Sequence, residues 1–377
     1  MKKDTIFVSI ASYRDKLCNN TIINLYNNSK FPENIYLGIV QQNKEDDLDC
    51  LHNIYNPRIK IIRLSYLDAK GPTYARYLCS KLWDNEEYFF QIDAHTKFVK
   101  DWDIKCITAI KKIKNLGLSE KPVLSHYPRS INDYIIPSYK KFVVTYIKNV
   151  FFNKYGIIKY DGAGFINTKN TFIKTPFVTG CMLFTESKFL KDIPFDPNLD
   201  YLFTGEEILH SIRFFTHGFD VFIPNENIIF HSYIRNNEPK LWDDIKYENK
   251  KIKTIEKLFK VLNSKNNYDA NIILNDYGLG YNRTLNEFYN FSNIDIINKK
   301  FIKFNDNINN KNNINNINNI NNINNKNNKN NINNLHDINN INNKNNKNDI
   351  YNTKNIIYFI LFFSIILLFI FLIKNIF

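Results

Sequence analysis

Cysteine is scarce in this sequence and follows no recurring spacing. The 377 residues include five cysteines, an odd number, and no CxxC motif joins any two of them. This pattern predicts neither a disulfide framework nor a structural zinc site. Reduced cysteines are typical of the cytosol, so the cysteines favour a cytosolic protein. The five are Cys18, Cys50, Cys79, Cys106 and Cys181.

The sequence also lacks a secretory signal. Its first residues, MKKDTIFVSIASYRD, have a basic start, but the apolar run that follows is short and ends at Arg14 and Asp15. A signal peptide has a longer apolar region before its cleavage site. The amino terminus therefore agrees with a cytosolic location.

No nucleic-acid recognition motif is present, although the chain is basic. The formal net charge is +13; residues 301–377 hold eight Lys and three Asp, which is +5, and this leaves +8 for the rest. The lysines of that remainder are dispersed, so we expect no nucleic-acid partner. A site for a nucleotide or polyphosphate explains the excess charge as well.

Residues 301–354 lack any period that would build a packed face. They consist mostly of NNI and NNK repeats, which predict a disordered linker. The alternative is an Asn-rich segment that associates through β-pairing.

A charge-free run follows this linker. The sequence IIYFILFFSIILLFIFLI, residues 356–373, lies between Lys354 and Lys374. Its length suits one helix across a hydrocarbon core of about 30 Å, so we predict a transmembrane anchor over residues 355–374. A buried core helix is the alternative. Because only residues 374–377 follow the run, we expect a single-pass tail anchor that leaves the bulk of the chain in the cytosol.

Residues 1–300 alternate between strand-like and helix-like patterns, which predicts an α/β domain with a mostly parallel central sheet flanked by helices. The segment 127–175 has no clear pattern. The expected strands are TIFVSIA, IYLGIVQ, IKIIRLS, EYFFQID, PVLSHYP and TPFVTGCMLFTE, followed by paired strands in FDVFIPNENIIFHSYIR; the expected helices span residues 18–28, 71–83, 101–115 and 204–218.

The stretch EEYFFQIDAH ends a predicted buried strand with Asp93 and His95 around one alanine. Ligands in such sheets bind at the carboxyl ends of strands. A carboxylate and a neutral imidazole are ligands for a divalent ion such as Mn²⁺. His231, at the end of IIFH, is the candidate third ligand. The alternatives are a solvated loop for the pair and a structural role for His231.

Other candidates flank the same edge. Ser12, Arg14 and Asp15 follow the first strand, where a nucleotide base or ribose would lie; a local ion pair explains Arg14 and Asp15 equally well. In GPTYARYL, Gly71 allows a close approach, and Arg76 is placed to hold a diphosphate oxygen. A plain surface arginine is the alternative.

Two carboxylates and two tryptophans complete the set. Glu206 and Glu207 begin a predicted helix, where one of them, with Glu206 favoured, would grip the sugar or orient the acceptor hydroxyl. Capping and the helix dipole explain acidic residues there too. Trp102 and Trp242 would stack on sugar faces, although a tryptophan in an apolar setting is more often core.

Several blocks in order resemble the N-acetylglucosaminyltransferases that modify a hydroxyproline on the adaptor of SCF ubiquitin ligases. The blocks are IFVSIASYRDKLCNNTI, IYLGIVQQN, GPTYARYLCSKLWDNEEYFFQIDAH, FVTGCMLF and LFTGEEILHSIRFFTHGFDVFIPNENIIFHSYIR. They cover about residues 4–245. The similar polypeptide GalNAc transferases also have a D-x-H metal motif, which Asp93 and His95 match, and a later His, which His231 matches.

The resemblance implies a GT-A fold and a metal-dependent, retaining transfer of GlcNAc from UDP-GlcNAc to a hydroxyproline, Ser or Thr hydroxyl of an acceptor protein. It also implies Mn²⁺ or another divalent cation, with Asp93 contacting both metal and donor. The alternative is a catalytically inactive, tail-anchored scaffold or UDP-sugar-binding module. Four N-x-S/T sequons, at Asn19, Asn27, Asn282 and Asn290, would accept N-glycans if the domain were lumenal.

Overall fold

The computed structural model describes residues 2–134, 140–235 and 238–302. These residues belong to one compact unit, Met1–Phe304. Within these three ranges no helix combines the length and apolar character that crossing a bilayer requires. The predicted anchor over residues 355–374, and the predicted linker beyond residue 302, lie outside the described residues.

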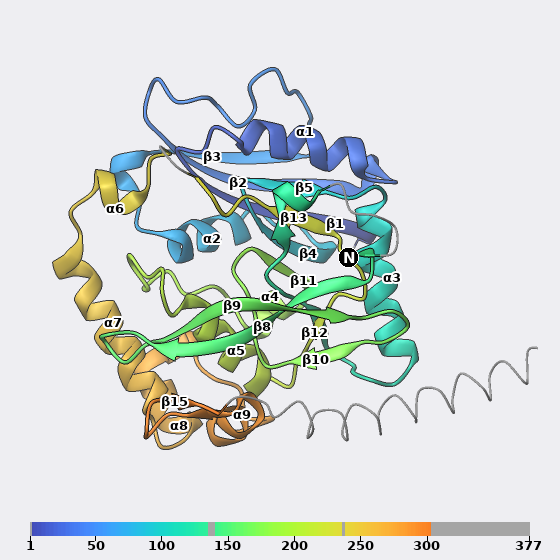
Figure 1. Ribbon diagram of the computed structural model, residues 1–377. Coiled ribbons are helices and arrows are strands. Elements are labelled where there is room, and N and C mark those ends of the chain that lie inside the picture. The colour runs from blue at the N-terminus through green and yellow to red at the C-terminus, as the bar shows by residue number, and fades with distance from the viewer. Residues whose placement is uncertain (1, 135–139, 236–237, 303–377) are drawn as a thin grey trace, which may run out of the picture. The chain divides into compact units, whose positions relative to one another are not determined.

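An eight-stranded sheet forms the centre of the described part (Figure 1). Its half built from the amino-terminal strands is parallel, whereas β11 runs antiparallel to both of its neighbours. In the other half β12 and β6 are also parallel, whereas β10 and β12 are antiparallel, so the sheet is mixed and the prediction of a mostly parallel sheet is confirmed only in part. The strand order is β10 (Ile173–Thr175), β12 (Asp220–Ile223), β6 (Pro122–Leu124), β11 (Met182–Glu186), β4 (Glu86–Asp93), β1 (Lys2–Tyr13), β2 (Ile35–Asn43) and β3 (Ile59–Ser65).

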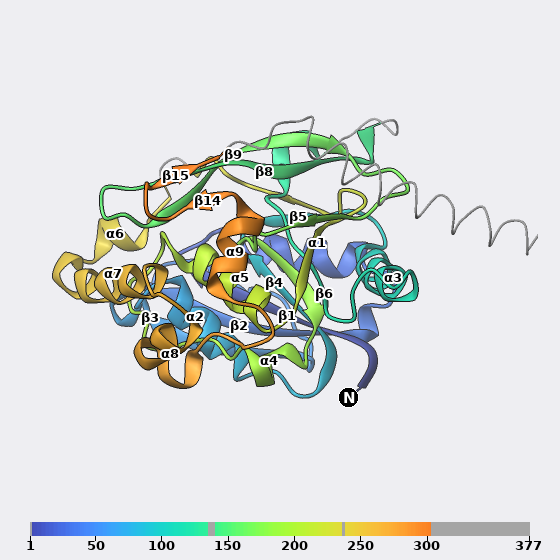
Figure 2. The same cartoon turned by 90° about the horizontal axis from the view of Figure 1, so that it is seen from below.

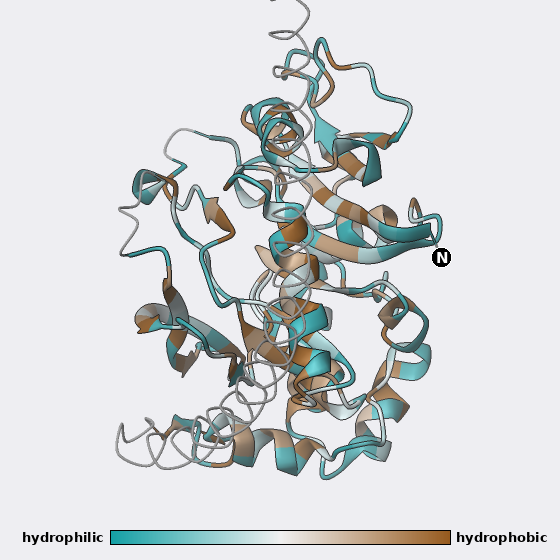
Figure 3. Cartoon of the chain, turned by 90° about the vertical axis from the view of Figure 1, so that its right-hand side faces the viewer, coloured by the Kyte–Doolittle hydropathy of each residue, from teal (hydrophilic) through white to brown (hydrophobic). Residues whose placement is uncertain are grey.

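The central strands are almost continuously apolar because both faces of the sheet are covered. Along β1, Ile6, Val8 and Ile10 pack in one core with α1 (Cys18–Asn28) and α3 (Trp102–Asn115), whereas Phe7 packs in another core with residues of α4 (Phe189–Asp192) and α5 (Glu206–Thr216). Figure 2 shows these helices around the sheet, and Figure 3 shows apolar stretches along its strands.

The helices that flank the site begin where the sequence predicts. Helix α2 (Pro72–Ser80) follows Gly71, whose φ of 96° is in the left-handed region, and Pro72 occupies its first turn. Helix α5 likewise follows Gly205, with φ of 108°. Both glycines are needed, since a Cβ at Gly71 would lie 3.2 Å from the Tyr201 backbone and one at Gly205 would lie 2.2 Å from Leu258.

A small second sheet brings distant segments together next to the main one. It consists of β5 (Thr96–Phe98), β13 (Ile229–His231) and β7 (Arg129–Ser130), in that order. The prediction that residues 219–235 form paired strands was wrong: β12 and β13 exist, but each pairs with other strands. This register places His231 opposite Thr96.

The segment 127–175, which shows no clear pattern, contains a long hairpin of β8 (Val143–Phe152) and β9 (Ile158–Asn167). It packs in a separate core with the carboxyl-terminal helices. Those elements are α6 (Leu241–Asp244), α7 (Glu248–Leu262), α8 (Asn267–Leu274), α9 (Leu285–Ser292), β14 (Ile294–Asp295) and β15 (Lys300–Phe301).

The cysteine prediction was wrong in one respect. A disulfide joins Cys18, the first residue of α1, to Cys50 in the loop after β2, and the other three cysteines are free and buried. The two partners are 32 residues apart. Pairing at such a distance depends on how the helix packs on the sheet, which spacing along the chain does not reveal.

Candidate active site

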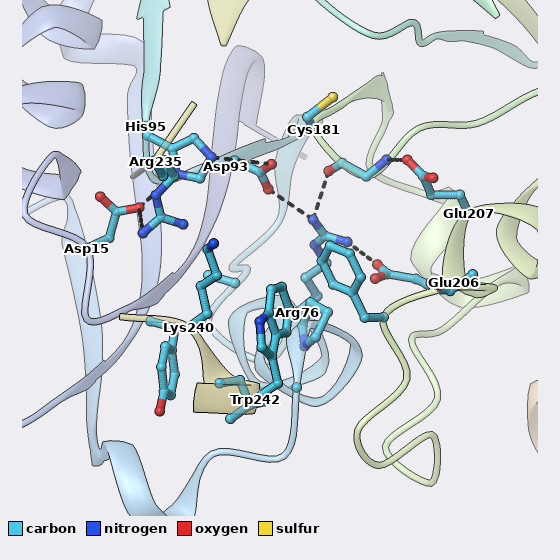
Figure 4. A pocket seen from close by; sticks show the side chains of 18 of the residues that line it. Asp15, Arg76, Asp93, His95, Cys181, Glu206, Glu207, Arg235, Lys240 and Trp242 are labelled. Carbon is cyan, nitrogen blue, oxygen red and sulfur yellow. Dashed lines mark hydrogen bonds and ion pairs between the residues drawn. The ribbon is translucent and has the colours of Figure 1, made fainter. Parts of the chain in front are cut away.

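A pocket of about 700 Å³ opens at the carboxyl ends of β1 and β4 (Figure 4). That volume is typical of sites for small molecules and cofactors. The end of β1 contributes Tyr13 and Asp15, and the end of β4 contributes Asp93 and then His95. The pocket therefore lies where the α/β pattern predicts a ligand.

Asp93, His95 and His231 form a candidate metal site. One ligand atom from each lies within 4.8 Å of the others. Nε2 of His231 is 2.9 Å from Oδ2 of Asp93, and Nε2 of His95 is 3.9 Å from the same oxygen. An oxygen and two imidazole nitrogens suit a divalent transition-metal ion. Nδ1 of His231 is buried without a hydrogen-bond partner among the described residues, and the ring packs against those of His95 and Tyr233.

The ring of His95 is oriented by Asp15. Nδ1 of His95 lies 2.7 Å from Oδ2 of Asp15, which leaves Nε2 facing Asp93. Arg235 also pairs with that carboxylate, at 3.0 Å. Burial alone would raise the pKa of Asp15, but His95 and Arg235 outweigh it and lower that pKa. A carboxylate behind a ligating histidine fixes the ring and raises its basicity.

Electrostatics favour the ligating forms of Asp93 and His231. Burial works against the charge on Asp93, but the hydrogen bond with His231 and the positive charge of Arg76 help to lower its pKa below the usual range. Burial lowers the pKa of His231, against the opposing effect of Asp93. A carboxylate that stays ionised and an imidazole that stays neutral are the forms that bind a metal ion.

Arg76 lines the pocket but already has three partners. Its guanidinium pairs with Asp93 at 3.1 Å, donates to the Gly180 carbonyl at 2.9 Å, and forms a close pair with Glu206. It is buried rather than a plain surface arginine. A role in holding a diphosphate oxygen stays a prediction.

The two glutamates at the start of α5 differ in their partners. Glu206 is buried against Arg76. Glu207 accepts hydrogen bonds from the Gly180 N–H at 2.8 Å and from the Tyr127 hydroxyl at 2.6 Å. Both line the pocket. Capping and the helix dipole alone do not account for either glutamate, since each carboxylate has a partner outside α5.

Of the candidates at the end of β1, only Asp15 lines the pocket. The side chain of Arg14 turns to Asp47 and Asp244, at 2.8 and 3.0 Å, so the local ion pair with Asp15 is not formed. The hydroxyl of Ser12 is buried without a hydrogen-bond partner in the described part. Asp15 and Gly71 line the pocket. Asp15 is the one of these that acts on the candidate metal site.

The two tryptophans differ in exposure, and only Trp242 lines the pocket. Trp102 is fully buried, and its indole N–H donates to the Leu25 carbonyl, so it belongs to the core. Trp242 is 49% exposed, lines the pocket, and contacts the ring of Phe203, which is 56% exposed. These two rings give the pocket an apolar rim suited to a sugar face or an acceptor side chain.

Several lining residues were not predicted as site residues, and three of them hydrogen-bond to or pair with the predicted ones: Tyr127, Gly180 and Arg235. Gly180 lies in the predicted strand TPFVTGCMLFTE, but its peptide group acts through hydrogen bonds to Arg76 and Glu207. Tyr127 lies in the segment without a pattern. Arg235 follows His231 by four residues in HSYIR, and this basic residue next to a candidate ligand was the available signal.

The model of the glycosyltransferase (GlcNAc) family matches residues 5–57 and 52–298. The chain therefore belongs to this family. No curated protein matches the sequence.

One solved structure supports the fold, and a second is similar to a smaller degree. The crystal structure of GalNAc-T7 with UDP, GalNAc and Mn²⁺ is 14% identical over 68% of this chain, with a TM-score of 0.50; the chain spans 48% of that protein. That of S. aureus TarS 1-349 with UDP-GlcNAc is 13% identical over 77% of this chain and 74% of its own, with a TM-score of 0.44. The α/β glycosyltransferase fold is confirmed, with a mixed sheet.

Proposed function

We propose that the chain transfers GlcNAc from UDP-GlcNAc to a hydroxyl of an acceptor protein, with a divalent cation at Asp93, His95 and His231. The observation that carries the proposal is the Asp-His-His cluster at the strand ends, inside a pocket of about 700 Å³. The family assignment supports the sugar. The presence of UDP, GalNAc and Mn²⁺ in the GalNAc-T7 crystal supports a UDP-sugar and Mn²⁺.

The chain's own residues prepare this site. Asp15 fixes the His95 ring, and Arg76 holds Asp93 from the opposite side. Arg235 balances the charge on Asp15. A divalent cation bound there would supply Lewis-acid stabilisation of the departing diphosphate, which is worth several kcal/mol.

The acceptor and the stereochemistry belong to the proposal as well. The resemblance to the hydroxyproline GlcNAc transferases favours a hydroxyproline, Ser or Thr hydroxyl and a retained anomeric configuration. Same-face attack by the acceptor hydroxyl is favoured, because neither carboxylate at the start of α5 is free of partners: Glu206 pairs with Arg76, and Glu207 binds Gly180 and Tyr127.

The test is hydrolysis of UDP-GlcNAc by the purified full-length chain with Mn²⁺. We expect Asp93→Ala to lower the rate about a hundredfold or more, since it removes the shared ligand of the cluster. Asp46→Ala changes an exposed aspartate outside the pocket and is the matched control. Equal turnover by Asp93→Ala and the parent chain would refute the metal-dependent mechanism.

The same experiment separates the enzyme from a scaffold. A scaffold with a glycosyltransferase fold would bind UDP-GlcNAc, measured by calorimetry, without hydrolysing it or transferring it to any acceptor tried. The intact Asp-His-His cluster argues for the enzyme.

We propose that a tail anchor at residues 355–374 holds the chain on a membrane with the catalytic domain in the cytosol. The cysteines no longer support this location. Disulfides persist mainly in oxidising compartments, so the Cys18–Cys50 bond removes the argument from free cysteines. Of the four sequons, Asn19 is buried, whereas Asn27, Asn282 and Asn290 are exposed. A glycosidase-sensitive shift in mobility would place the domain in the lumen instead.

A further inference from the structure

Glu207 is held from two sides within the pocket wall. One carboxylate oxygen accepts the Gly180 N–H at 2.8 Å, and the other accepts the Tyr127 hydroxyl at 2.6 Å. Tyr127 comes from the segment between β6 and β7, Gly180 precedes β11, and Glu207 is the second residue of α5. Two segments outside α5 therefore fix this carboxylate, and each of the three residues lines the pocket.

This carboxylate is linked to the candidate metal site through the Gly180 peptide group and Arg76. The carbonyl of Gly180 accepts from Arg76 at 2.9 Å and from the Gln91 side chain at 2.8 Å, while its N–H faces Glu207. Arg76 in turn pairs with Asp93. The dashed lines of Figure 4 trace this path from Asp93 to Glu207. Glu207 thus lies at the far end of a hydrogen-bonded chain that begins at the metal ligands.

Opposing effects act on the pKa of Glu207. Burial is the largest effect and raises its pKa to about 7, although the hydrogen bonds from Tyr127 and Gly180 and the charge of Arg76 lower it, and Glu206 raises it. Tyr127 stays protonated, because burial and Glu207 raise its own pKa. Cys181, Tyr160 and Tyr233 also interact electrostatically with Glu207. Of the groups that face this carboxylate, only Tyr127 donates a side-chain hydrogen bond to it in the described part.

We propose that Tyr127 is a positioning residue: its hydroxyl fixes and stabilises the Glu207 carboxylate, which accepts a hydrogen bond from a hydroxyl entering the pocket. The hydroxyl belongs either to the GlcNAc of the donor or to the attacking acceptor, and the chemistry of recognition is the same. This inference rests on the proposed function, because it requires a sugar nucleotide in the pocket. It adds a residue to which neither motif nor resemblance assigns a role.

The test compares the full-length parent chain with Tyr127→Phe between pH 5.5 and 8.5, with Mn²⁺ present. The first measurement is the ratio of the Kd for UDP to the Kd for UDP-GlcNAc, which isolates the contribution of the sugar. The second is kcat for UDP-GlcNAc hydrolysis, in which water supplies the attacking hydroxyl. Each quantity is plotted against pH, and the one that depends on ionised Glu207 should rise as this carboxyl loses its proton. Loss of the Tyr127 donor raises the pKa of Glu207, so this rising limb should move to higher pH by about one pH unit.

Two further variants control the comparison. Tyr289→Phe removes a buried tyrosine hydroxyl outside the pocket, which donates to the Leu262 carbonyl at 2.5 Å, so it should leave the rising limb of both pH profiles in place. Glu207→Gln keeps the shape of the side chain and should abolish the limb. Thermal melting of each variant confirms that it is folded.

Each outcome decides between the possibilities. A shift in the binding ratio assigns the carboxylate to the donor sugar, and a shift in kcat alone assigns it to the attacking hydroxyl; both support the proposal. A parent chain that binds and hydrolyses UDP-GlcNAc while Tyr127→Phe shifts neither limb overturns this inference and leaves the proposed function intact. A parent chain that does not bind UDP-GlcNAc overturns both.

Discussion

Asp15 influences the candidate metal site through a ligand rather than as one. Its carboxylate is 4% exposed and lies between His95 and Arg235. A buried carboxylate between two cationic or polarisable groups stays ionised and holds the imidazole in one orientation. Its effect should therefore be measurable in metal affinity without any substrate.

We predict that Asp15→Asn weakens Mn²⁺ binding about tenfold or more, the usual consequence of removing a carboxylate behind a ligating histidine. The amide can still accept a hydrogen bond, but it carries no charge to polarise the imidazole or to balance Arg235. Free Mn²⁺ can be followed by electron paramagnetic resonance during a titration of the full-length chain. Asp46→Asn, at an exposed position, is the control. Equal affinities for Asp15→Asn and the parent chain would show that the His95 ring does not depend on Asp15.

The residue types of the site could be predicted, but several partners could not. Asp93 and His95 are adjacent to a strand end in the sequence, so the α/β pattern alone places them at the pocket. His231 joins them because β13 pairs with β5, a long-range contact that no local pattern contains. The partners of Arg14 lie 33 and 230 residues away along the chain, which is why a local ion pair was a reasonable but wrong alternative.

At the scale of elements, the loop after β2 depends on the Cys18–Cys50 disulfide. This loop carries Asp47, which pairs with Arg14, and Asp49, which pairs with Arg63. The side chain of Asn19, next to Cys18, donates to the backbone carbonyls of Cys50 and His52. Helix α1 and the loop are therefore joined by one covalent bond and two hydrogen bonds.

We predict that the Cys18→Ser, Cys50→Ser double variant is less stable by about 2–4 kcal/mol, because the bond closes a loop of 32 residues. Urea unfolding followed by circular dichroism measures the difference. A reducing agent should lower the stability of the parent chain by a similar amount and leave the double variant unchanged, which makes the variant its own control. A parent chain that is indifferent to reduction would show that the two thiols are not bonded in solution.

Elements with a clear period were predictable, and the others were not. The strand IKIIRLS and the helix over residues 18–28 coincide with β3 and α1. A short apolar run predicts a strand and an amphipathic pattern predicts a helix, so the local sequence is enough to identify both elements. The hairpin β8–β9 was missed because only the first residues of β9 alternate between buried and exposed; beyond Tyr160 the strand has no fully buried residue. The hairpin packs against the carboxyl-terminal helices, and the local sequence does not predict this long-range contact.

For the molecule as a whole, several buried titratable groups make folding sensitive to acid. Burial lowers the pKa of His126 to about 4 and that of His210 to about 3, whereas the ordinary value is 6.5. Glu207 has the opposite sign, since its raised pKa lets the folded state take up a proton first. The net pH dependence is a sum over such groups, so one group is best isolated by comparing a variant with its parent at each pH.

His126 is suited to that comparison because it is 2% exposed, with Nδ1 3.0 Å from Thr145 Oγ1 and Nε2 without a hydrogen-bond partner among the described residues. Above pH 6.5 neither state protonates this imidazole; as pH falls toward 4 the unfolded state binds the proton first, and stability is lost. Between pH 7.5 and 5 the loss due to His126 is about 2 kcal/mol. In His126→Asn the amide can replace Nδ1 without titrating, so its free energy of unfolding should fall less than that of the parent chain by that amount. Urea titrations at both pH values measure this, with the exposed His52→Asn as a control that keeps the parental fall. Equal falls for His126→Asn and the parent chain would mean that the folded state protonates His126 as readily as the unfolded chain does.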